Sequence, residues 1–134
     1  MSDAASWALE IDRDWAAQMG DLHGAVEYIG LQAIRRIDMR SPVDTGRFRG
    51  NWTLSFGAAD GDITAVLDPS GSATVARNTG MMTAYPREGF PVIYLQNNLP
   101  YAERLEQGYS TQAPSGMVGI TVADLAAIWE ATEI

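Results

Sequence analysis

The chain has 134 residues and a net charge of −8, with nine basic residues that are all arginine and no cysteine. A hydrophobic content of 46% with 19% charged residues is typical of a folded chain, and this length suits a single domain over residues 1–134. The acidic charge argues against general nucleic-acid binding, and missing cysteine excludes disulfides and thiolate chemistry. We expect no membrane span, because no apolar run is long enough, and no signal peptide, because the first residues carry no basic region.

The first 40 residues predict an extended arm followed by a long helix. Residues 6–11 alternate in the manner of a short strand, and Asp12 or Asp14 can cap a helix behind them. Glycines weaken that helix and allow a kink near Gly20–Gly24. From Arg13 to Met39, apolar residues recur at steps of three and four, as in an amphipathic helix; they are Trp15, Met19, Leu22, Val26, Ile29, Ala33 and Ile37.

The stretch Ser41–Gly46, called the central turn below, separates this helix from a strand pattern. Pro42 disfavours helical backbone at Ser41, so the helix should end at Arg40. Asp44 and Gly46 favour a sharp turn. Residues 47–57 then alternate as a strand, with an apolar face of Phe48, Trp52, Leu54 and Phe56 and an opposite face that carries Arg47 and Arg49.

The second half predicts short elements. Asp60-Gly61 indicates a hairpin, whose return strand carries Ile63, Ala65 and Leu67 and ends at Asp68. Ser72 is a candidate cap for a short helix over residues 73–82. The remaining expectations are a strand at Val92–Asn97 inside the sheet, a helix from Pro100 to a terminating Gly108, and a final helix from Met117 to Glu130.

These elements predict an α+β fold with a long N-terminal helix, a small antiparallel-rich sheet, further short helices and a C-terminal helix. We expect one buried cluster of Trp52, Phe56, Leu95, Leu105 and Trp129, each on the apolar side of its element. His23, the only histidine, is interpreted as a surface residue because no second metal ligand lies nearby. Asp60, Asp62 and Asp68 do not have the spacing of a calcium loop and are interpreted as turn residues.

Two stretches carry a resemblance to a known family. Residues 41–52 read SPVDTGRFRGNW, and residues 97–118 read NNLPYAERLEQGYSTQAPSGMV. In this order they resemble the neck or tail-completion proteins of long-tailed bacteriophages, the group that includes minor tail protein Z. The similarity covers nearly the whole chain, and related particles such as gene transfer agents keep similar proteins.

The resemblance implies a non-enzymatic virion protein of the tail and neck region. It implies a homo-oligomeric ring, usually of six copies, at the head–tail junction, beside the tail terminator, the stopper or connector, and the tail tube. It implies no catalytic residue, cofactor or metal, and no membrane partner. In such a ring, the arginine face of Arg47 and Arg49 and the acidic residues Glu103 and Glu106 offer opposite charges for contacts between copies or with neck partners. Without the resemblance, the same charges are interpreted as solvated faces.

Two alternatives remain open. The chain can be a minor tail or adaptor protein elsewhere in the connector, with weak contacts to a DNA channel through five arginines around the central turn, Arg35, Arg36, Arg40, Arg47 and Arg49. It can also be a small hydrolase that uses Glu103 and Glu106 as paired carboxylates, although no histidine, cysteine or third orienting group accompanies them.

Overall fold

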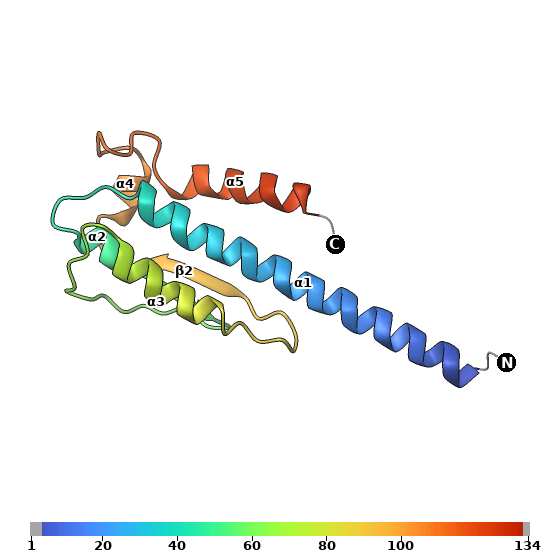
Figure 1. The fold of residues 1–134 in the computed structure, drawn as a ribbon. Helices are drawn as coiled ribbons and strands as arrows, with labels where there is room; N and C mark the ends of the chain where they lie inside the picture. The colour runs from blue at the N-terminus through green and yellow to red at the C-terminus, as the bar shows by residue number, and fades with distance from the viewer. Residues whose placement is uncertain (1–3, 133–134) are drawn as a thin grey trace.

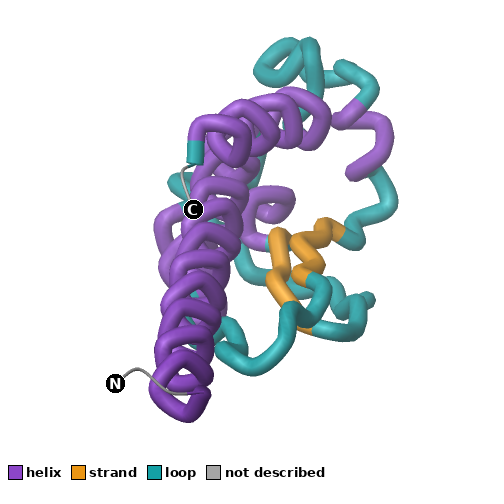
Figure 2. Tube along the Cα trace, turned by 90° about the vertical axis from the view of Figure 1, so that its right-hand side faces the viewer, coloured by secondary structure: helices purple, strands orange, loops and turns teal. Residues whose placement is uncertain are grey.

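The computed structural model describes the backbone of residues 4–132 and the side chains of residue 17 and residues 20–132. It has an α+β architecture in which one long helix, α1, lies between helix α5 on one side and helix α3 with a small sheet on the other (Figure 1). Figure 2 shows the two strands together on one side of α1, bordered by loops. The predicted fold class is therefore confirmed.

Helix α1 spans Ala4–Arg40, about 55 Å at the standard helical rise, and its first half projects beyond the other elements (Figure 1). The predicted helix is confirmed, but the extended arm over residues 6–11 is wrong, and Asp12 and Asp14 lie inside the helix rather than at its start. The alternating positions of residues 7 and 11 are also four apart, which fits a helical face, and a short apolar run does not distinguish the two periods. The surrounding alanines favour the helix.

The helix ends at Arg40, as Pro42 predicts, and the central turn follows. The strand predicted over residues 47–57 is only partly correct, because Arg47–Gly50 form one helical turn, α2, before strand β1 at Trp52–Phe56. Phe48 and Trp52 are both buried, as the alternation required, since residues four apart also share one face of a helical turn. The burial pattern was therefore predictable while the backbone of residues 47–50 was not.

The predicted return strand after the hairpin is wrong. Residues 57–71 contain no regular strand, and the large apolar side chains Ile63 and Leu67 are exposed. The backbone of Thr64 bonds to the side chain of Asn51 rather than to a neighbouring strand, with N–H and C=O contacts of 2.9 and 3.0 Å. Amide side chains therefore hold this segment in place where a strand ladder was expected.

The sheet has two antiparallel strands, β1 and β2, and β2 spans Ile93–Asn97. Trp52 pairs with Asn97, and Phe56 pairs with Ile93. The strand predicted at Val92–Asn97 is present, but a two-stranded sheet has no internal strand, so the expected interior position is wrong. Leu95 nevertheless packs against both buried clusters, which explains the apolar composition of β2.

The three remaining helices are α3 at Ser72–Met82, α4 at Ala102–Glu106 and α5 at Val118–Ala131. Gly108 follows α4 with a φ of 89°, as predicted for a terminating glycine. The predicted Ser72 cap is wrong, because Gly71 occupies the cap position without a side-chain cap bond. The Asp68 carboxylate instead accepts the Thr74 N–H at 2.8 Å and so satisfies a donor in the first turn of α3.

The core consists of two buried clusters rather than one. One cluster contains Ile37, Phe48, Trp52, Leu99, Ala113 and Met117, and the other contains Ile34, Leu54, Met82 and Tyr85. Of the five predicted core residues, Trp52 is buried and three pack at the edges of the clusters: Phe56, Leu95 and Leu105. Trp129 is 41% exposed, so its predicted burial is wrong.

His23 is also placed differently from its prediction as a surface residue. Its side chain is only 3% exposed, stacks on Phe90 at a centroid distance of 4.1 Å, and lies 2.7 Å from the Gly89 carbonyl oxygen through Nε2. The loop that covers it comes from a distant part of the sequence, which the pattern around residue 23 does not reveal. Among the described residues, no helix is both long and apolar enough to cross a membrane.

We predict that Gly46→Ala destabilises the protein more than Gly57→Ala. Both glycines have positive φ, 89° and 77°, where alanine costs about 1–2 kcal/mol. A Cβ at Gly46 would also overlap the backbone of Asp68 and Pro69, whereas a Cβ at Gly57 meets open space. Urea unfolding should show an additional loss of about 1–3 kcal/mol for Gly46→Ala; equal losses would contradict the close packing of the central turn.

Candidate functional site

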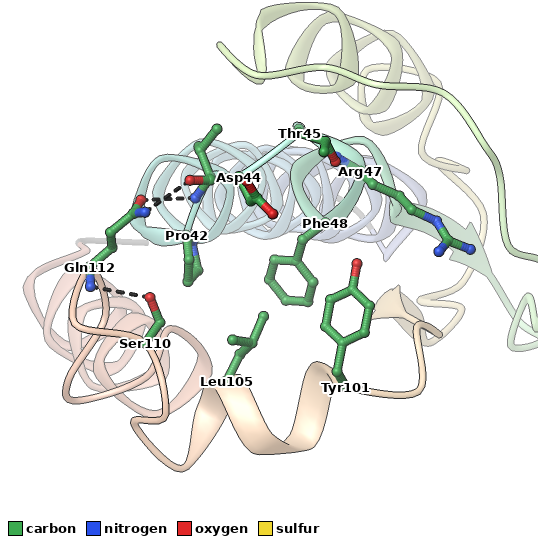
Figure 3. A pocket seen from close by; sticks show the side chains of 11 residues that line it. Pro42, Asp44, Thr45, Arg47, Phe48, Tyr101, Leu105, Ser110 and Gln112 are labelled. Carbon is green, nitrogen blue, oxygen red and sulfur yellow. Dashed lines mark hydrogen bonds between the residues drawn. The ribbon is translucent and has the colours of Figure 1, made fainter.

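The two stretches that carry the family resemblance meet around one pocket, called the turn pocket below (Figure 3). One wall is formed by residues 42–48, and the other by residues 101 and 105 with residues 110 and 112. Gln112 joins the walls, because its amide accepts the Val43 N–H and donates to the Val43 carbonyl, both at 2.9 Å. Segments about sixty residues apart in the chain are thus held together at one surface.

The turn pocket has an apolar interior and a polar rim. Phe48, Tyr101 and Leu105 point into it (Figure 3), and the rings of Phe48 and Tyr101 lie 6.1 Å apart between centroids. Its volume is about 230 Å³. Asp44 and Arg47 lie exposed at the rim. Aromatic walls with charges at the edge are suited to accept one large apolar side chain from another protein.

Arg47 and Arg49, predicted together as a contact face, have different environments. Arg47 is exposed, and its guanidinium makes no hydrogen bond or ion pair with the described residues. Arg49 donates instead to backbone carbonyls of its own chain, at distances from 2.9 to 3.4 Å; they belong to Ser41, Pro69, Ser70 and Met39. Arg47 therefore remains a candidate contact residue, whereas Arg49 stabilises the fold.

Glu103 and Glu106 differ in the same way. Glu103 is exposed, while the Glu106 carboxylate accepts the N–H groups of Met117, Val118 and Gly119 at 2.7 to 3.0 Å. Burial acts to raise the pKa of Glu106, but these three hydrogen bonds outweigh it and lower the pKa. Glu106 therefore caps the N-terminus of α5 from α4, where the helix dipole also favours a negative charge.

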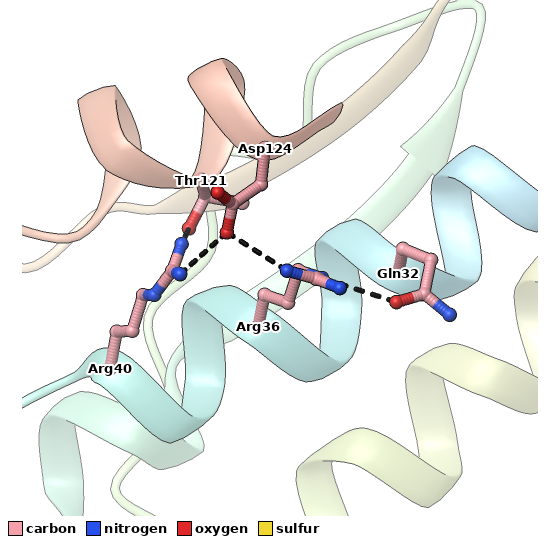
Figure 4. Close-up of polar contacts among 5 residues, drawn as sticks. All are labelled: Gln32, Arg36, Arg40, Thr121 and Asp124. Atoms are coloured by element: carbon pink, nitrogen blue, oxygen red, sulfur yellow. Dashed lines mark hydrogen bonds and ion pairs between the residues drawn. The ribbon is translucent and has the colours of Figure 1, made fainter. Parts of the chain in front are cut away.

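A charged cluster between α1 and α5 was not predicted from the sequence (Figure 4). Asp124 accepts hydrogen bonds from Arg36 at 2.9 Å and from Arg40 at 2.5 Å, and Arg40 also donates to the Thr121 hydroxyl at 3.1 Å. Hydrogen bonds from Arg40 and Arg36 lower the pKa of Asp124. The spacing of these residues could have indicated the cluster. Arg36 and Arg40 share one face of α1, and Thr121 and Asp124 share one face of α5.

Asp38 forms a second unpredicted feature beneath the central turn. Its side chain is 1% exposed, and neither carboxylate oxygen accepts a hydrogen bond from a described residue. It lies against Gly71, where a Cβ would overlap its Oδ1. Burial raises the pKa of Asp38 to about 7 against the opposing charges of Arg49 and Arg77, and Asp68 adds to the rise.

Neither alternative function gains support from this arrangement. The hydrolase alternative needs a pocket carboxyl group with a raised pKa, but Glu106 has a lowered pKa and is occupied as a helix cap. The DNA-channel alternative relies on five arginines, of which Arg36, Arg40 and Arg49 are bonded within the chain, so only the exposed Arg35 and Arg47 are left for such contacts among the described residues. No group of three metal-binding side chains occurs among the described residues. The arrangement is suited to a protein contact.

We predict that Asp38→Asn removes a pH dependence of stability. The pKa of Asp38 is raised from 3.8 to about 7 in the folded protein, so the folded form binds the proton more tightly than the unfolded form. The stability from this proton is fully present below pH 3.8 and is lost as the pH rises through about 7. The slope is at most about 1.4 kcal/mol per pH unit. Urea unfolding at pH 5 and pH 8 should show this loss in the wild type but not in Asp38→Asn. The exposed Asp62→Asn variant should keep it, and an unchanged profile in Asp38→Asn would contradict the assignment.

We also predict that Glu106→Ala destabilises α5 by about 1–2 kcal/mol, because three N–H groups lose a charged acceptor. Glu103→Ala on the same helix is the matched control and should change stability little. Amide hydrogen exchange should become faster at residues 117–119 in Glu106→Ala. Since the Glu106 pKa is lowered in the folded protein, its stabilising effect should disappear as the wild type is acidified through that pKa. Unchanged exchange would show that the cap contributes nothing.

Three comparisons of this chain with known proteins gave the same result. Neither a scan against protein-family models, nor a search of curated proteins, nor a search of solved structures returned a match.

Proposed function

We propose that this chain is a structural virion protein of the phage neck. In this proposal it forms a homo-oligomeric ring of six copies at the head–tail junction, next to the tail terminator or the stopper. Its role there is to complete the tail for joining to a filled head. The same role applies if the chain belongs to a prophage or a gene transfer agent.

The observation that carries this proposal is the meeting of residues 41–52 and 97–118 at the turn pocket. These are the two stretches that resemble tail-completion proteins, and in the fold they form one surface rather than two separate ones. That surface contains an apolar pocket and a charged rim, and Glu106 in the second stretch is bonded to the start of α5 and has a lowered pKa. Such a surface supports a role in assembly better than a role in catalysis.

The surface of α5 gives independent support. Four of its large hydrophobic side chains are exposed: Val118, Ile120, Val122 and Trp129. Scattered apolar residues are normal on protein surfaces, but the spacing of Val118, Val122 and Trp129 puts these three on one side of the helix, which is typical of a face that another protein covers. A subunit of a ring has such faces, because each copy presents one patch to each neighbour.

The test is a head–tail joining experiment with the particle that encodes this chain. Deleting the gene should leave filled heads and finished tails unjoined, and adding the purified protein should restore joining. Arg47→Glu should fold normally by circular dichroism but restore joining at least about tenfold less well. The reason is that losing one partner of a desolvated charge pair lowers the affinity of an interface by more than about tenfold. The exposed Arg104→Glu on α4 is the matched control and should restore joining fully.

Two results would contradict the proposal in different ways. Joined particles in the absence of the protein would show that it has no part in tail completion. Full activity of Arg47→Glu would leave the function intact but remove the rim of the turn pocket from the contact. Negative-stain imaging of the purified protein, alone and with the tail terminator, would show whether a ring forms and how many copies it has.

A further inference from the structure

Helix α5 carries large apolar residues on its exposed side as well as on the side that packs against α1. The packed side has Thr121, which is 2% exposed, and Asp124, which pairs with two arginines (Figure 4), together with the half-buried Leu125 and Ile128. The outward positions carry apolar residues, among them Val122 and Trp129. A helix normally buries its apolar stripe and exposes its polar one. The exposed stripe of α5 is therefore left without a cover inside its own chain.

Trp129 is the largest exposed side chain of this stripe. It lies in the last turns of α5, about 17 Å along the helix from Val118. The helix begins beside the turn pocket, because residues 110 and 112 line that pocket shortly before Val118. Residue 129 therefore belongs to the end of α5 that is farther from the loop leading into the helix (Figure 1), and Trp129 is not among the residues that line the pocket of its own chain.

The turn pocket has the size and lining that a tryptophan side chain requires. Its volume is about 230 Å³. A protein cavity of roughly 150 Å³ accepts a benzene molecule, so an indole ring fits within the larger space. Phe48 and Tyr101 offer aromatic faces, and Leu105 offers an aliphatic one (Figure 3). Aromatic rings in such a setting contact one another edge to face or with offset stacking.

The charges beside the two features are complementary. Arg47 at the rim of the turn pocket makes no ion pair with the described residues, and Glu130, directly after Trp129, is exposed and likewise makes none. Trp129 with the neighbouring carboxylate of Glu130 therefore matches an apolar pocket with the guanidinium of Arg47 at its rim. In a chain of net charge −8, an arginine at the contact also reduces the repulsion between copies.

We propose that Trp129 of one copy inserts into the turn pocket of a second copy of this chain, with Glu130 facing Arg47. This contact rests on the proposed ring and specifies how its subunits join. Anchor and pocket lie on different parts of each copy, so the contact is heterologous and repeats from copy to copy, which closes a ring when the rotation between copies allows it. A standard interface buries about 800 Å² on each partner, so the rest of the exposed α5 stripe contributes to the contact as well.

The first experiment measures self-association of the full chain by sedimentation and by size-exclusion chromatography with light scattering. Trp129→Ala should weaken association at least about tenfold, since aromatic anchors dominate interface affinity. The exposed Tyr28→Ala on α1 should leave it unchanged. Arg47→Glu and Glu130→Arg should each weaken association, and the double variant should recover much of it, as expected for two charges in contact.

A mixing experiment tests the heterologous geometry. Asp44→Trp places a bulky side chain on the exposed rim and should block the turn pocket while leaving Trp129 available. Alone, neither Trp129→Ala nor Asp44→Trp should assemble. Mixed, they should form pairs that grow no further, because one copy supplies an intact pocket and the other an intact tryptophan. Tyr101→Ala, which removes part of the pocket wall, provides a second pocket variant in case Asp44→Trp does not fold.

Three outcomes would overturn this contact. The first is assembly by Trp129→Ala with the wild-type association constant, the second is no pairing in the mixture, and the third is a wild-type chain that stays monomeric at the highest soluble concentration. A monomeric wild type would also count against the ring in the proposed function, but the role in tail completion fails only if heads and tails join without the protein. The two proposals can therefore fail separately.

Discussion

The guanidinium of Arg49 is the interaction on which the position of the central turn depends. It donates to carbonyls at the end of α1 and at the entrance of α3, among them Met39, Ser41 and Pro69. Gly46 contributes the second link, because its carbonyl accepts the Asp68 N–H at 3.0 Å. An arginine suits this role because its five donors are arranged in a rigid plane and stay charged at any relevant pH. The turn is thereby attached to the loop before α3, and one wall of the turn pocket is fixed in place.

Polar side chains, rather than backbone ladders, join distant segments of the chain, including the opposite wall of the turn pocket. Gln112 bonds to both backbone groups of Val43, as Asn51 does to Thr64. The Trp52 indole N–H donates to the Ser41 hydroxyl at 2.8 Å, which joins β1 to the central turn from inside the core. With only two strands in the sheet, the fold has few ladder hydrogen bonds between distant segments. Amide and hydroxyl side chains supply that cohesion instead.

Much of the fold was predictable from local signals, because those signals act over a few residues. Pro42 ended α1, Gly108 ended α4, and the burial of Phe48 and Trp52 followed from their spacing. The return strand after residue 60 failed for a different reason. Its alternation was real, but no partner strand was available to pair with it, and pairing is a property of the whole sheet.

The candidate site shows the same division between local and distant information. The sequence singled out four charged residues, and the chain's own contacts separate them into two pairs. Arg49 and Glu106 bind backbone groups that lie far away in sequence or across a loop, which no residue pattern specifies. Arg47 and Glu103 stay exposed. Motif and charge therefore indicated the right region of the surface but did not distinguish structural charges from available ones.

Helix α5 connects the stability of the subunit to its assembly. Its contact with α1 relies on ion pairs to Asp124 that are partly open to solvent, and such pairs contribute little and weaken with salt. Leu125 and Ile128 are only half-buried, and Val122 and Trp129 are exposed. Glu106 and the buried Met117 hold the start of α5, whereas no fully buried side chain follows Thr121 in the helix. A neighbour that covers the outer side would therefore stabilise α5 by binding it, because any partner that binds only the folded form shifts the folding equilibrium towards it.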